Sequence, residues 1–239
     1  MRQVLVTGGG SGIGRDVARD FLAAGDEVTI AGRRMDALEE TSGGKMRCMS
    51  VDVTDEDSVK GLFDRPYDVV VANAGAGHGI PVAQMPSQIW HDTIAVNLTG
   101  VFYTFRAALQ AGMEPGGRLI AMASIASLKG GGGLAAYAAA KHGVLGLVRS
   151  VAIEVAKSGI TCNAVCPGFV DTDMAAGAVK NVMKRMEVDQ ASAEKMLVAN
   201  NPMRRMITVD EVTAAVRFLA SPDASMINGH DMVVSGGEI

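Results

Sequence analysis

Two side chains that could exchange a proton stand four residues apart in a run of strong helix formers, Tyr137 and Lys141 within Leu134–Lys141. Side chains at i and i+4 share one face of a helix, so the lysine ammonium can lie beside the phenol. A free phenol has a pKa of ~10, and a nearby cation lowers an acidic pKa by ~1–3 units. The spacing therefore predicts a tyrosine that works as an acid or base near neutral pH.

A serine is available to the same reaction. Ser124 follows the apolar run Leu119–Met122, which is predicted to be a strand, and so should emerge at that strand's carboxyl end. There its hydroxyl could hydrogen-bond a substrate carbonyl. Taken singly, a Tyr–Lys pair at this spacing or a serine after a strand is more often structural than catalytic. The interpretation depends on what accompanies them.

A glycine-rich loop, Thr7 to Gly14, lies between the first apolar run and an amphipathic segment. Its spacing does not fit GxGxxG, but glycines at these positions allow a tight turn and close approach of the backbone to a pyrophosphate at a helix N-terminus. A merely flexible loop is the alternative. Its place between strand and helix favours a dinucleotide site, formed by Gly8, Ser11, Gly12, Ile13 and Gly14.

The second apolar run ends in Gly32-Arg33-Arg34, about 20 residues beyond the glycine loop, where a dinucleotide fold binds the adenosine ribose. An acidic side chain there would bind the two hydroxyls of NAD, and Gly32 cannot. Arg33 offers a planar guanidinium suited to a 2′-phosphate, and Arg34 or Arg15 could assist. NADP(H) is therefore favoured over NAD(H), the alternative being that Arg33 and Arg34 are ordinary solvated charges.

The elements that must position these groups alternate along the chain. Continuously apolar runs predict strands buried on both faces: Val4–Val6, Val28–Ala31, Val69–Ala72, Leu119–Met122, Ile160–Val165 and Met232–Val234. Amphipathic spacing predicts a helix after Gly14 and others near 34–41, 55–63, 86–110, 134–157 and 208–220. The last helix has Thr208 as N-cap and Glu211 three residues on. This alternation predicts an open doubly wound α/β domain.

In this order the pieces resemble the short-chain dehydrogenase/reductase family, from Thr7 to Thr172. Thr7-Gly-x-x-x-Gly12-x-Gly14 is similar to the family's cofactor turn. The resemblance implies one domain over 1–239, with a mostly parallel seven-stranded sheet, helices on both faces and a small helical lid. The other matching cofactor segments are the adenine-contacting pair Asp52-Val53, the ribose strand end Asn73-Ala74-Gly75, and the nicotinamide loop with Pro167, Gly168, Val170 and Thr172.

The same resemblance implies the chemistry. Ser124 and Tyr137-x-x-x-Lys141 match the catalytic serine and the YxxxK motif, and Asn97 matches the helical asparagine that holds a water in the proton relay. NADPH would deliver hydride to a ketone carbon while Tyr137 protonates its oxygen and Ser124 polarises it. Lys141 would bind the nicotinamide ribose, lower the tyrosine pKa and reach solvent through the water on Asn97.

Composition excludes several other classes. With 22 basic and 26 acidic side chains among 239 residues, the net charge of −4 gives no reason to bind nucleic acid or anionic lipid. The longest charge-free span, Val69 to Trp90, contains Pro81 and Pro86 and is a poor membrane span. Three apolar-flanked cysteines without CxxC spacing, no signal peptide and four scattered histidines predict a soluble cytoplasmic protein that needs no metal.

Residues 171–207 break the regular alternation. This insertion is expected to lie like a lid over the carboxyl ends of the strands. Its methionines could line an adaptable acyl-binding surface, but plain core packing is the favoured interpretation at roughly two to one. They are Met174, Met183, Met186, Met196, Met203 and Met206. The glycine run Gly130–Gly133 is expected either to give the pocket a mobile or roomy wall or to be an inert loop.

The segment Gly159–Met174 looks most like the 3-oxoacyl and polyketide ketoreductases. The favoured function is thus NADPH-dependent reduction of a 3-oxoacyl thioester or a similar ketone. The alternatives are an NAD-dependent secondary-alcohol or hydroxybutyrate-type dehydrogenase and a non-catalytic dinucleotide sensor. Small residues that permit close helix contacts, together with the resemblance, predict a homotetramer: Ala135, Ala136, Ala139, Gly143 and Gly146.

Overall fold

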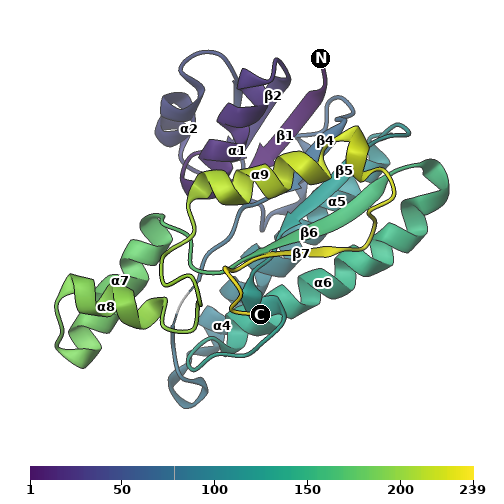
Figure 1. Cartoon of the computed structure of the whole chain (residues 1–239). Coiled ribbons are helices and arrows are strands. Elements are labelled where there is room, and N and C mark those ends of the chain that lie inside the picture. Colours follow the sequence, from purple (N-terminus) through teal and green to yellow (C-terminus); the bar gives the residue numbers. More distant parts are fainter. Residues whose placement is uncertain (78) are drawn as a thin grey trace.

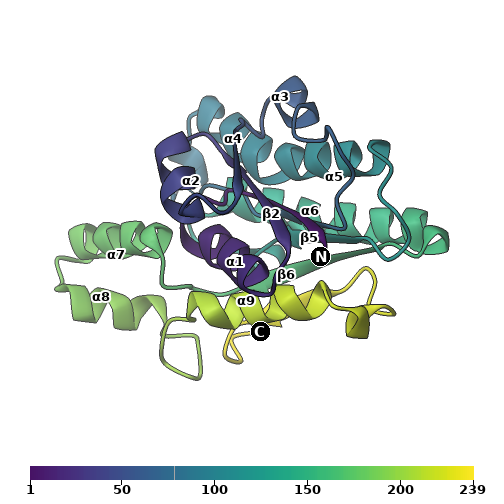
Figure 2. The ribbon, with the colours of Figure 1, turned by 90° about the horizontal axis from the view of Figure 1, so that it is seen from above.

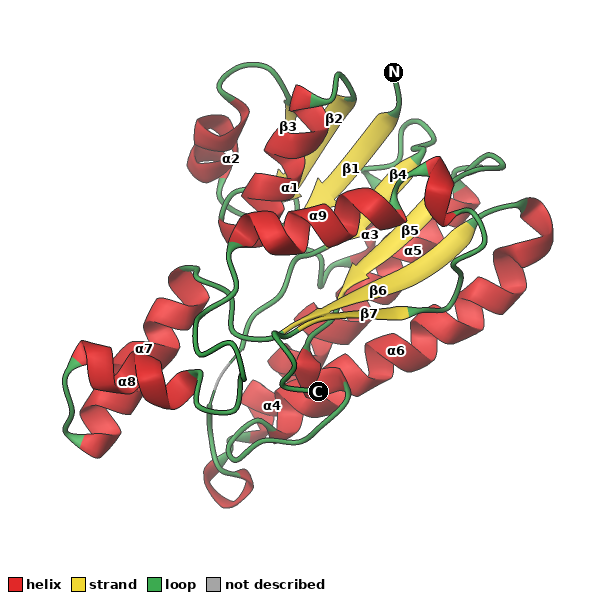
Figure 3. Ribbon diagram, in the orientation of Figure 1, coloured by secondary structure: helices red, strands yellow, loops and turns green. Residues whose placement is uncertain are grey.

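Seven parallel strands form one twisted sheet in the order β3-β2-β1-β4-β5-β6-β7. The computed structural model describes residues 1–77 and 79–239, and His78, one of the four scattered histidines, lies outside the described residues. The strands (Figures 1 and 3) are β1 (Gln3–Thr7), β2 (Glu27–Gly32), β3 (Arg47–Ser50), β4 (Val69–Ala72), β5 (Arg118–Met122), β6 (Thr161–Pro167) and β7 (Asp231–Val234).

The six apolar runs all form strands, and the doubly wound fold with seven strands is confirmed. The run pattern alone misses β3, one of the two edge strands, which pairs only with β2. Its residues Arg47–Ser50 are half-buried or exposed, so β3 lacks the continuous apolarity that a strand between two neighbours requires.

Helices cover both faces of the sheet. Figure 2 shows α1 and α9 on one side and α5 and α6 on the other. Val17, Leu38 and Val216 carry the first core layer, and Val59, Phe105 and Val148 the second. The helices are α1 (Gly12–Ala23), α2 (Met35–Ser42), α3 (Glu56–Lys60), α4 (Ser87–Ile94), α5 (Gly100–Gln110), α6 (Ala135–Val155), α7 (Asp173–Met186), α8 (Gln190–Leu197) and α9 (Val209–Leu219).

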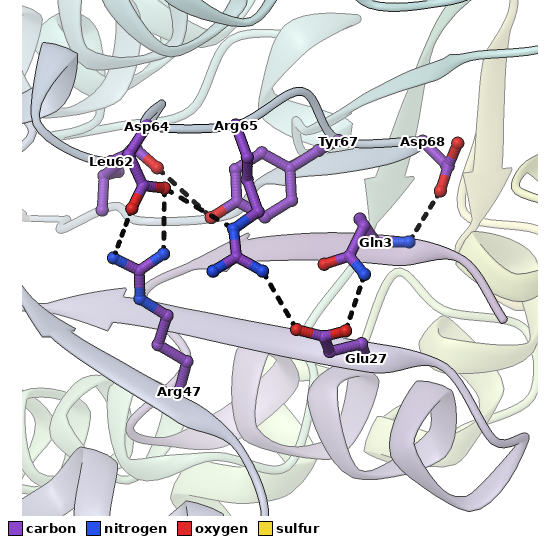
Figure 4. A network of polar contacts seen from close by, with 8 residues as sticks. All are labelled: Gln3, Glu27, Arg47, Leu62, Asp64, Arg65, Tyr67 and Asp68. Carbon is purple, nitrogen blue, oxygen red and sulfur yellow. Dashed lines mark hydrogen bonds and ion pairs between the residues drawn. The ribbon is translucent and has the colours of Figure 1, made fainter.

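Strand order reverses beside β1, which pairs with β2 on one side and β4 on the other. In open parallel sheets this reversal leaves a crevice at the carboxyl ends of the strands, where ligands bind. The opposite, amino-terminal edge is occupied instead by a polar network (Figure 4). There Arg47 forms two 2.9 Å hydrogen bonds to Asp64, and Glu27 accepts hydrogen bonds from Gln3 and Arg65.

The insertion at 171–207 forms the hairpin of α7 and α8, which projects from the body at the carboxyl edge of the sheet (Figure 1). An isolated parallel bridge between Val170 and Ile207 joins the two ends of the insertion. The capping box expected at the next helix is confirmed: the Thr208 hydroxyl accepts the Glu211 amide and the Glu211 carboxylate accepts the Thr208 amide.

The prediction that the insertion's methionines pack in the core is wrong. All six are half-buried or exposed, with Met174 53% and Met203 60% exposed. The buried residues of the two hairpin helices are small ones, Ala175, Val179 and Ala193. Because the hairpin projects from the body, it has no large core to which the methionines could contribute.

Candidate active site

The glycine loop after β1 is a backbone cradle that larger residues would fill. Gly8 and Gly12 have φ of 69° and 50°, in the left-handed region that favours glycine. A Cβ on Gly14 would overlap the Gly8 carbonyl oxygen and the Asn73 side chain. Helix α1 begins at Gly12, and its N-cap residue Ser11 makes no side-chain capping bond. Amides at this helix end are thus left for an anion, which fits the pyrophosphate of a dinucleotide.

Asn73 ties the ends of β4 and β1 together. Its amide group donates to the carbonyl oxygens of Thr7 and Gly8 at 3.0 and 3.3 Å. In return the Thr7 hydroxyl accepts the backbone amides of Asn73 and Ala74. The expected segment Asn73-Ala74-Gly75 therefore lies against the cradle, at the reversal of strand order.

The loop after β6 reaches the same cradle. A Cβ on Gly12 would lie 3.3 Å from Thr172 Cγ2, so the expected nicotinamide loop touches the glycine loop. Its first residues follow β6 directly, where Pro167 is paired with β7 and the Gly168 amide donates to the Val234 carbonyl. Val170 is held by its bridge to Ile207.

The arginines differ in what they contact. Arg33 and Arg34 are exposed and form no ion pair within the described part of the chain. Arg15, expected as a possible assistant, is already bound to the Gly10 carbonyl, Glu40 and Thr41. Arg15 therefore stabilises the loop rather than offering a free guanidinium.

Asp52, expected to contact adenine, follows β3 at the same edge. The backbone amide and hydroxyl of Thr54 donate to its carboxylate at 2.9 and 2.8 Å. These bonds lower the pKa of Asp52, with a smaller contribution from the charge of Arg33. Next to it, Val53 is buried against Gly100, where a Cβ would come within 2.9 Å of its side chain. Asp52 is thus a fixed carboxylate acceptor beside Arg33.

Tyr137 and Lys141 lie one turn apart on α6, as their spacing predicts. Lys141 is buried, its Nζ donates to the Met122 carbonyl oxygen at 2.7 Å, and it lies 5.6 Å from the centre of the Tyr137 ring. A Cβ on Gly75 would lie 3.7 Å from this Nζ and 2.8 Å from Asn97 Oδ1. The end of β4 therefore brings Asn97, Tyr137 and Lys141 into one place.

The predicted lowering of the tyrosine pKa by the cation is wrong for this structure. Burial raises the pKa of Tyr137, and a hydrogen bond with Ser124 opposes that rise. Burial also lowers the pKa of Lys141 to about 8. The ammonium lies over the ring and donates to a carbonyl oxygen, so desolvation outweighs its attraction for the phenolate. In this structure Tyr137 therefore holds its proton more firmly than a free phenol does.

Ser124 begins a single 3-10 turn, Ile125–Ser127, directly beyond β5. Its Oγ accepts the Ala126 amide at 3.1 Å, while its own amide donates to Ser127 Oγ at 3.3 Å. This capping box fixes the side chain at the carboxyl edge of the sheet, as predicted. The hydroxyl proton is left to donate, and Tyr137 is its neighbour.

Asn97 shows what the helical pattern could not reveal. The helix expected over 86–110 is interrupted by a π-helical turn, Ala95–Thr99, and Asn97 is completely buried within it. Its amide group donates to the carbonyl oxygens of Thr93 and Ala76 at 2.9 and 2.7 Å, and its Oδ1 accepts the Ala76 amide. Such turns are frequent at functional sites, but hydrophobic spacing carries no sign of one.

Three further contacts were missed by sequence reasoning. A Cβ on Gly77 would lie 3.6 Å from the Tyr137 ring, so this backbone forms a wall of the site. The Gly133 carbonyl accepts the Ile80 amide at 2.9 Å, which fixes the end of the glycine run. Buried Cys166 lies close enough to Lys141 to oppose the lowering of the lysine pKa. Burial raises the pKa of the Cys166 thiol to about 11.

Neither a metal centre nor a membrane segment is found in the described ranges 1–77 and 79–239. Within them no three His, Cys, Asp or Glu side chains gather closely enough to hold an ion. No helix in the same ranges has the length and apolarity to cross a bilayer.

Comparisons with known proteins show the family to which the chain belongs. Residues 8–238 match a family described as enoyl-(acyl carrier protein) reductase. The chain is 37% identical to the 3-oxoacyl-[acyl-carrier-protein] reductase MabA of Mycobacterium avium, with 99% of this chain and 89% of that protein covered. It is 35% identical to 3beta-hydroxysteroid dehydrogenase 2 of Eggerthella lenta, with 98% and 93% covered.

Solved structures of reductases are also similar to this chain. An actinorhodin polyketide ketoreductase variant with NADPH superposes with a TM-score of 0.94 at 32% identity, covering 99% of this chain and 97% of that one. Levodione reductase superposes with a TM-score of 0.90 at 30% identity, covering 99% and 97%. The chain therefore belongs to the short-chain dehydrogenase/reductase family and is an NAD(P)-dependent oxidoreductase acting on CH–OH and C=O groups.

Proposed function

We propose that the protein reduces a ketone to a secondary alcohol with NADPH, and that its substrates are 3-oxoacyl thioesters or similar ketones. The observation that carries this proposal is the convergence of Asn97, Ser124, Tyr137 and Lys141 beside the backbone cradle. A non-catalytic dinucleotide sensor would have no use for these four side chains in one place.

The bound cofactor supplies the hydride that reduces the carbonyl carbon. Ser124, held by its capping box, donates a hydrogen bond to the carbonyl oxygen, which orients and polarises the carbonyl and leaves the proton on the serine. Tyr137 Oη gives its proton to the same oxygen as negative charge develops there. Lys141, charged below its pKa of about 8, stabilises the resulting phenolate. A water at the Asn97 turn connects Lys141 to solvent and returns the proton.

The preference for NADPH is supported by Arg33. This exposed guanidinium follows β2 and lies near Asp52, without an ion pair to a described residue. A free guanidinium forms bidentate, charge-assisted hydrogen bonds to a phosphate. The actinorhodin ketoreductase neighbour was solved with NADPH. An NAD-dependent secondary-alcohol dehydrogenase is the second candidate, because the 3beta-hydroxysteroid dehydrogenase is about as similar as the ketoreductases.

The thioester substrate class is supported by the relatives and the insertion. The reductases of Mycobacterium avium and Escherichia coli, at 37% and 34% identity, are named for 3-oxoacyl carrier-protein substrates. Exposed methionines on α7 and α8 give an adaptable apolar surface for an acyl chain. We propose that this hairpin, residues 171–207, is a substrate lid of one domain spanning 1–239.

Assembly and compartment stay predictions. Of the small residues on α6, Ala136 is buried and Gly143 packs on Leu98 of the same chain, whereas Ala139 and Gly146 are exposed. The same helix carries Ile153, which is 79% exposed. We propose a homotetramer that uses this face, working in the cytoplasm. A monomer in sedimentation velocity would overturn the assembly.

The test is a panel assay with purified protein and both cofactors. We expect oxidation of NADPH with an acetoacetyl thioester to exceed that with simple ketones. Tyr137→Phe should lower kcat at least about 100-fold, because general acid catalysis contributes about 10²–10⁴-fold. NADPH binding of the variant, followed by calorimetry, should be unchanged. Full turnover by Tyr137→Phe, or faster NAD-linked oxidation of secondary alcohols, would overturn the proposal.

A further inference from the structure

Of the segments that follow the seven strands, the one after β7 has no role yet at the candidate site. Segments that follow β1 to β6 supply the cradle, Arg33, Asp52, Asn73, Ser124 and the loop from Gly168. Residues 235–239 leave β7 at the same edge of the sheet, close to the base of the projecting hairpin (Figure 1). Parallel strands end together, so this segment must come near the others.

Two glycines allow residues 235–239 to approach the end of the insertion closely. Gly236 has a φ of 63°, and a Cβ there would overlap the Asn201 side chain. Asn201 is only 5% exposed, donates to the Arg205 carbonyl at 2.9 Å and accepts the Met203 amide at 2.8 Å. A Cβ on Gly237 would lie 3.4 Å from Pro202. The close approach fixes where the next residue, Glu238, lies.

Glu238 carries a carboxylate that is almost removed from solvent. Its side chain is 5% exposed and accepts a hydrogen bond from Lys129 Nζ at 2.7 Å. A Cβ on Gly168 would lie 3.7 Å from its Oε2. Loss of Lys129 would leave this nearly buried carboxylate without the one ionic partner it has among the described residues, which is unfavourable.

Both contacts lead to the reacting groups. Lys129 lies two residues beyond the 3-10 turn that Ser124 caps, and its amide donates to the Ile125 carbonyl of that turn at 3.1 Å. Gly168 opens the loop that carries Val170 and Thr172, and its own amide is bound to β7. Glu238 thus lies between Lys129, just beyond the Ser124 turn, and Gly168 at the start of the cofactor loop.

We propose that Glu238 is a positioning residue: its ion pair with Lys129 and its place beside Gly168 hold the Ser124 turn in register with the loop that receives the nicotinamide. The inference rests on the proposed function, since register between these segments matters only if hydride transfer takes place between them. The proposal gives residues 235–239 a part in positioning the active-site segments. Neither the glycine loop nor the YxxxK motif indicates such a part.

The test begins with amide hydrogen exchange of the cofactor-free protein, which does not depend on activity. Glu238→Gln and Lys129→Met should speed exchange in peptides covering 124–129 and 168–172 by about tenfold or more, as the opening free energy of these segments falls. Arg47→Met is the matched control, because it breaks the two-bond pair with Asp64 at the opposite edge of the sheet (Figure 4). It should leave both peptides unchanged.

Kinetics then separate positioning from simple stability. With NADPH saturating, and at a temperature where each variant is fully folded by circular dichroism, both variants should lose about 10- to 100-fold in kcat, the size expected for a misplacement near 1 Å. Arg47→Met should keep its kcat under the same conditions. The charge swap Lys129→Glu with Glu238→Lys should recover part of kcat.

Each outcome decides between the two proposals. Unchanged exchange in both peptides, or a kcat no lower than that of Arg47→Met, would overturn the role of Glu238. Faster exchange with no ketone reduction by the unaltered protein would instead overturn the proposed function and leave the contacts of Glu238 standing.

Discussion

The two halves of the candidate site are built differently. On the cofactor side, from β1 to β4, backbone atoms and small residues meet at distances that exclude a Cβ, and Thr7 and Asn73 bind each other's backbone. On the proposed substrate side, the helices α7 and α8 bury only small residues and expose methionines. Rigid backbone contacts suit a ligand of constant shape, while flexible apolar side chains suit ligands that vary.

The two halves should differ most in stability and cofactor binding when a glycine in each is replaced by alanine, which adds one methyl group. Gly14→Ala places its Cβ against Gly8 and Asn73, whereas Gly177→Ala in α7 meets no atom within 4 Å. We expect Gly14→Ala to cost about 1–3 kcal/mol in unfolding free energy through overpacking and to weaken NADPH binding about 100-fold. Gly177→Ala should gain about 0.5–1 kcal/mol as a helix interior substitution.

Denaturant unfolding and calorimetric titration check both variants. Equal effects of the two substitutions would remove the contrast between a rigid cofactor side and an open insertion.

Arg33 tests how the cofactor side selects its ligand. Arg33→Ala should weaken NADPH binding about 10- to 100-fold, because a hydrogen bond to a charged group contributes about 1.5–3 kcal/mol, and should leave NADH binding unchanged. Arg34→Ala is the matched control and should have a smaller effect. Calorimetry with both cofactors measures the ratio, and equal affinities of the unaltered protein for NADPH and NADH would contradict the assignment.

The buried ammonium gives a pH dependence. Burial lowers the pKa of Lys141 from 10.5 to about 8, so the folded chain loses this proton first. Activity that needs the cation should fall about tenfold per pH unit above about 8. Stability should change in the opposite sense: between about 8 and 10.5 the unfolded chain binds the additional proton, so this group's contribution to stability rises with pH.

Lys141→Arg keeps its charge throughout this range, so its rate profile should lack the fall above pH 8 even where its turnover is low. A profile of the unaltered protein that is flat to pH 10 would show that the charge of Lys141 is not required.

The smallest effects should come from the substrate side. Met174→Ser and Met203→Ser remove exposed apolar surface from the insertion, and each should raise KM for a long-chain 3-oxoacyl thioester about three- to tenfold, the loss expected for part of a methionine side chain. KM for an acetoacetyl thioester and for NADPH should stay constant. If KM for NADPH moved with KM for the acyl substrate, the two halves would not be independent.

Predictions from the sequence succeed where one pattern has one structural solution. Continuous apolar runs predict strands, and five of the six lie between two neighbours while the sixth is the edge strand β7. Tyr137 and Lys141, four residues apart, must share a face of α6. The edge strand β3 and the π-helical turn at Asn97 have no comparable pattern. Their backbone is set by neighbours far away in the chain.

The errors have the same physical origin. A cation near a phenol predicts a lowered pKa, but that rule leaves out the burial of Tyr137, which outweighs it. Helical spacing of the insertion's methionines predicts a buried face, but whether a core lies opposite that face is a property of the tertiary fold. The ion pair of Lys129 with Glu238 joins residues 109 positions apart, and neither side chain has a distinguishing neighbour in the sequence.

The most direct test of the account is isotope tracing from NADPH that carries deuterium on the transferred position of the nicotinamide. Incubation with an acetoacetyl thioester should place one deuterium on the new carbinol carbon of the product, detected by mass spectrometry and NMR. Tyr137→Phe, with cofactor bound, should yield almost none in the same time. Product without the label, or equal labelling by Tyr137→Phe, would contradict hydride transfer to a carbonyl that Tyr137 protonates.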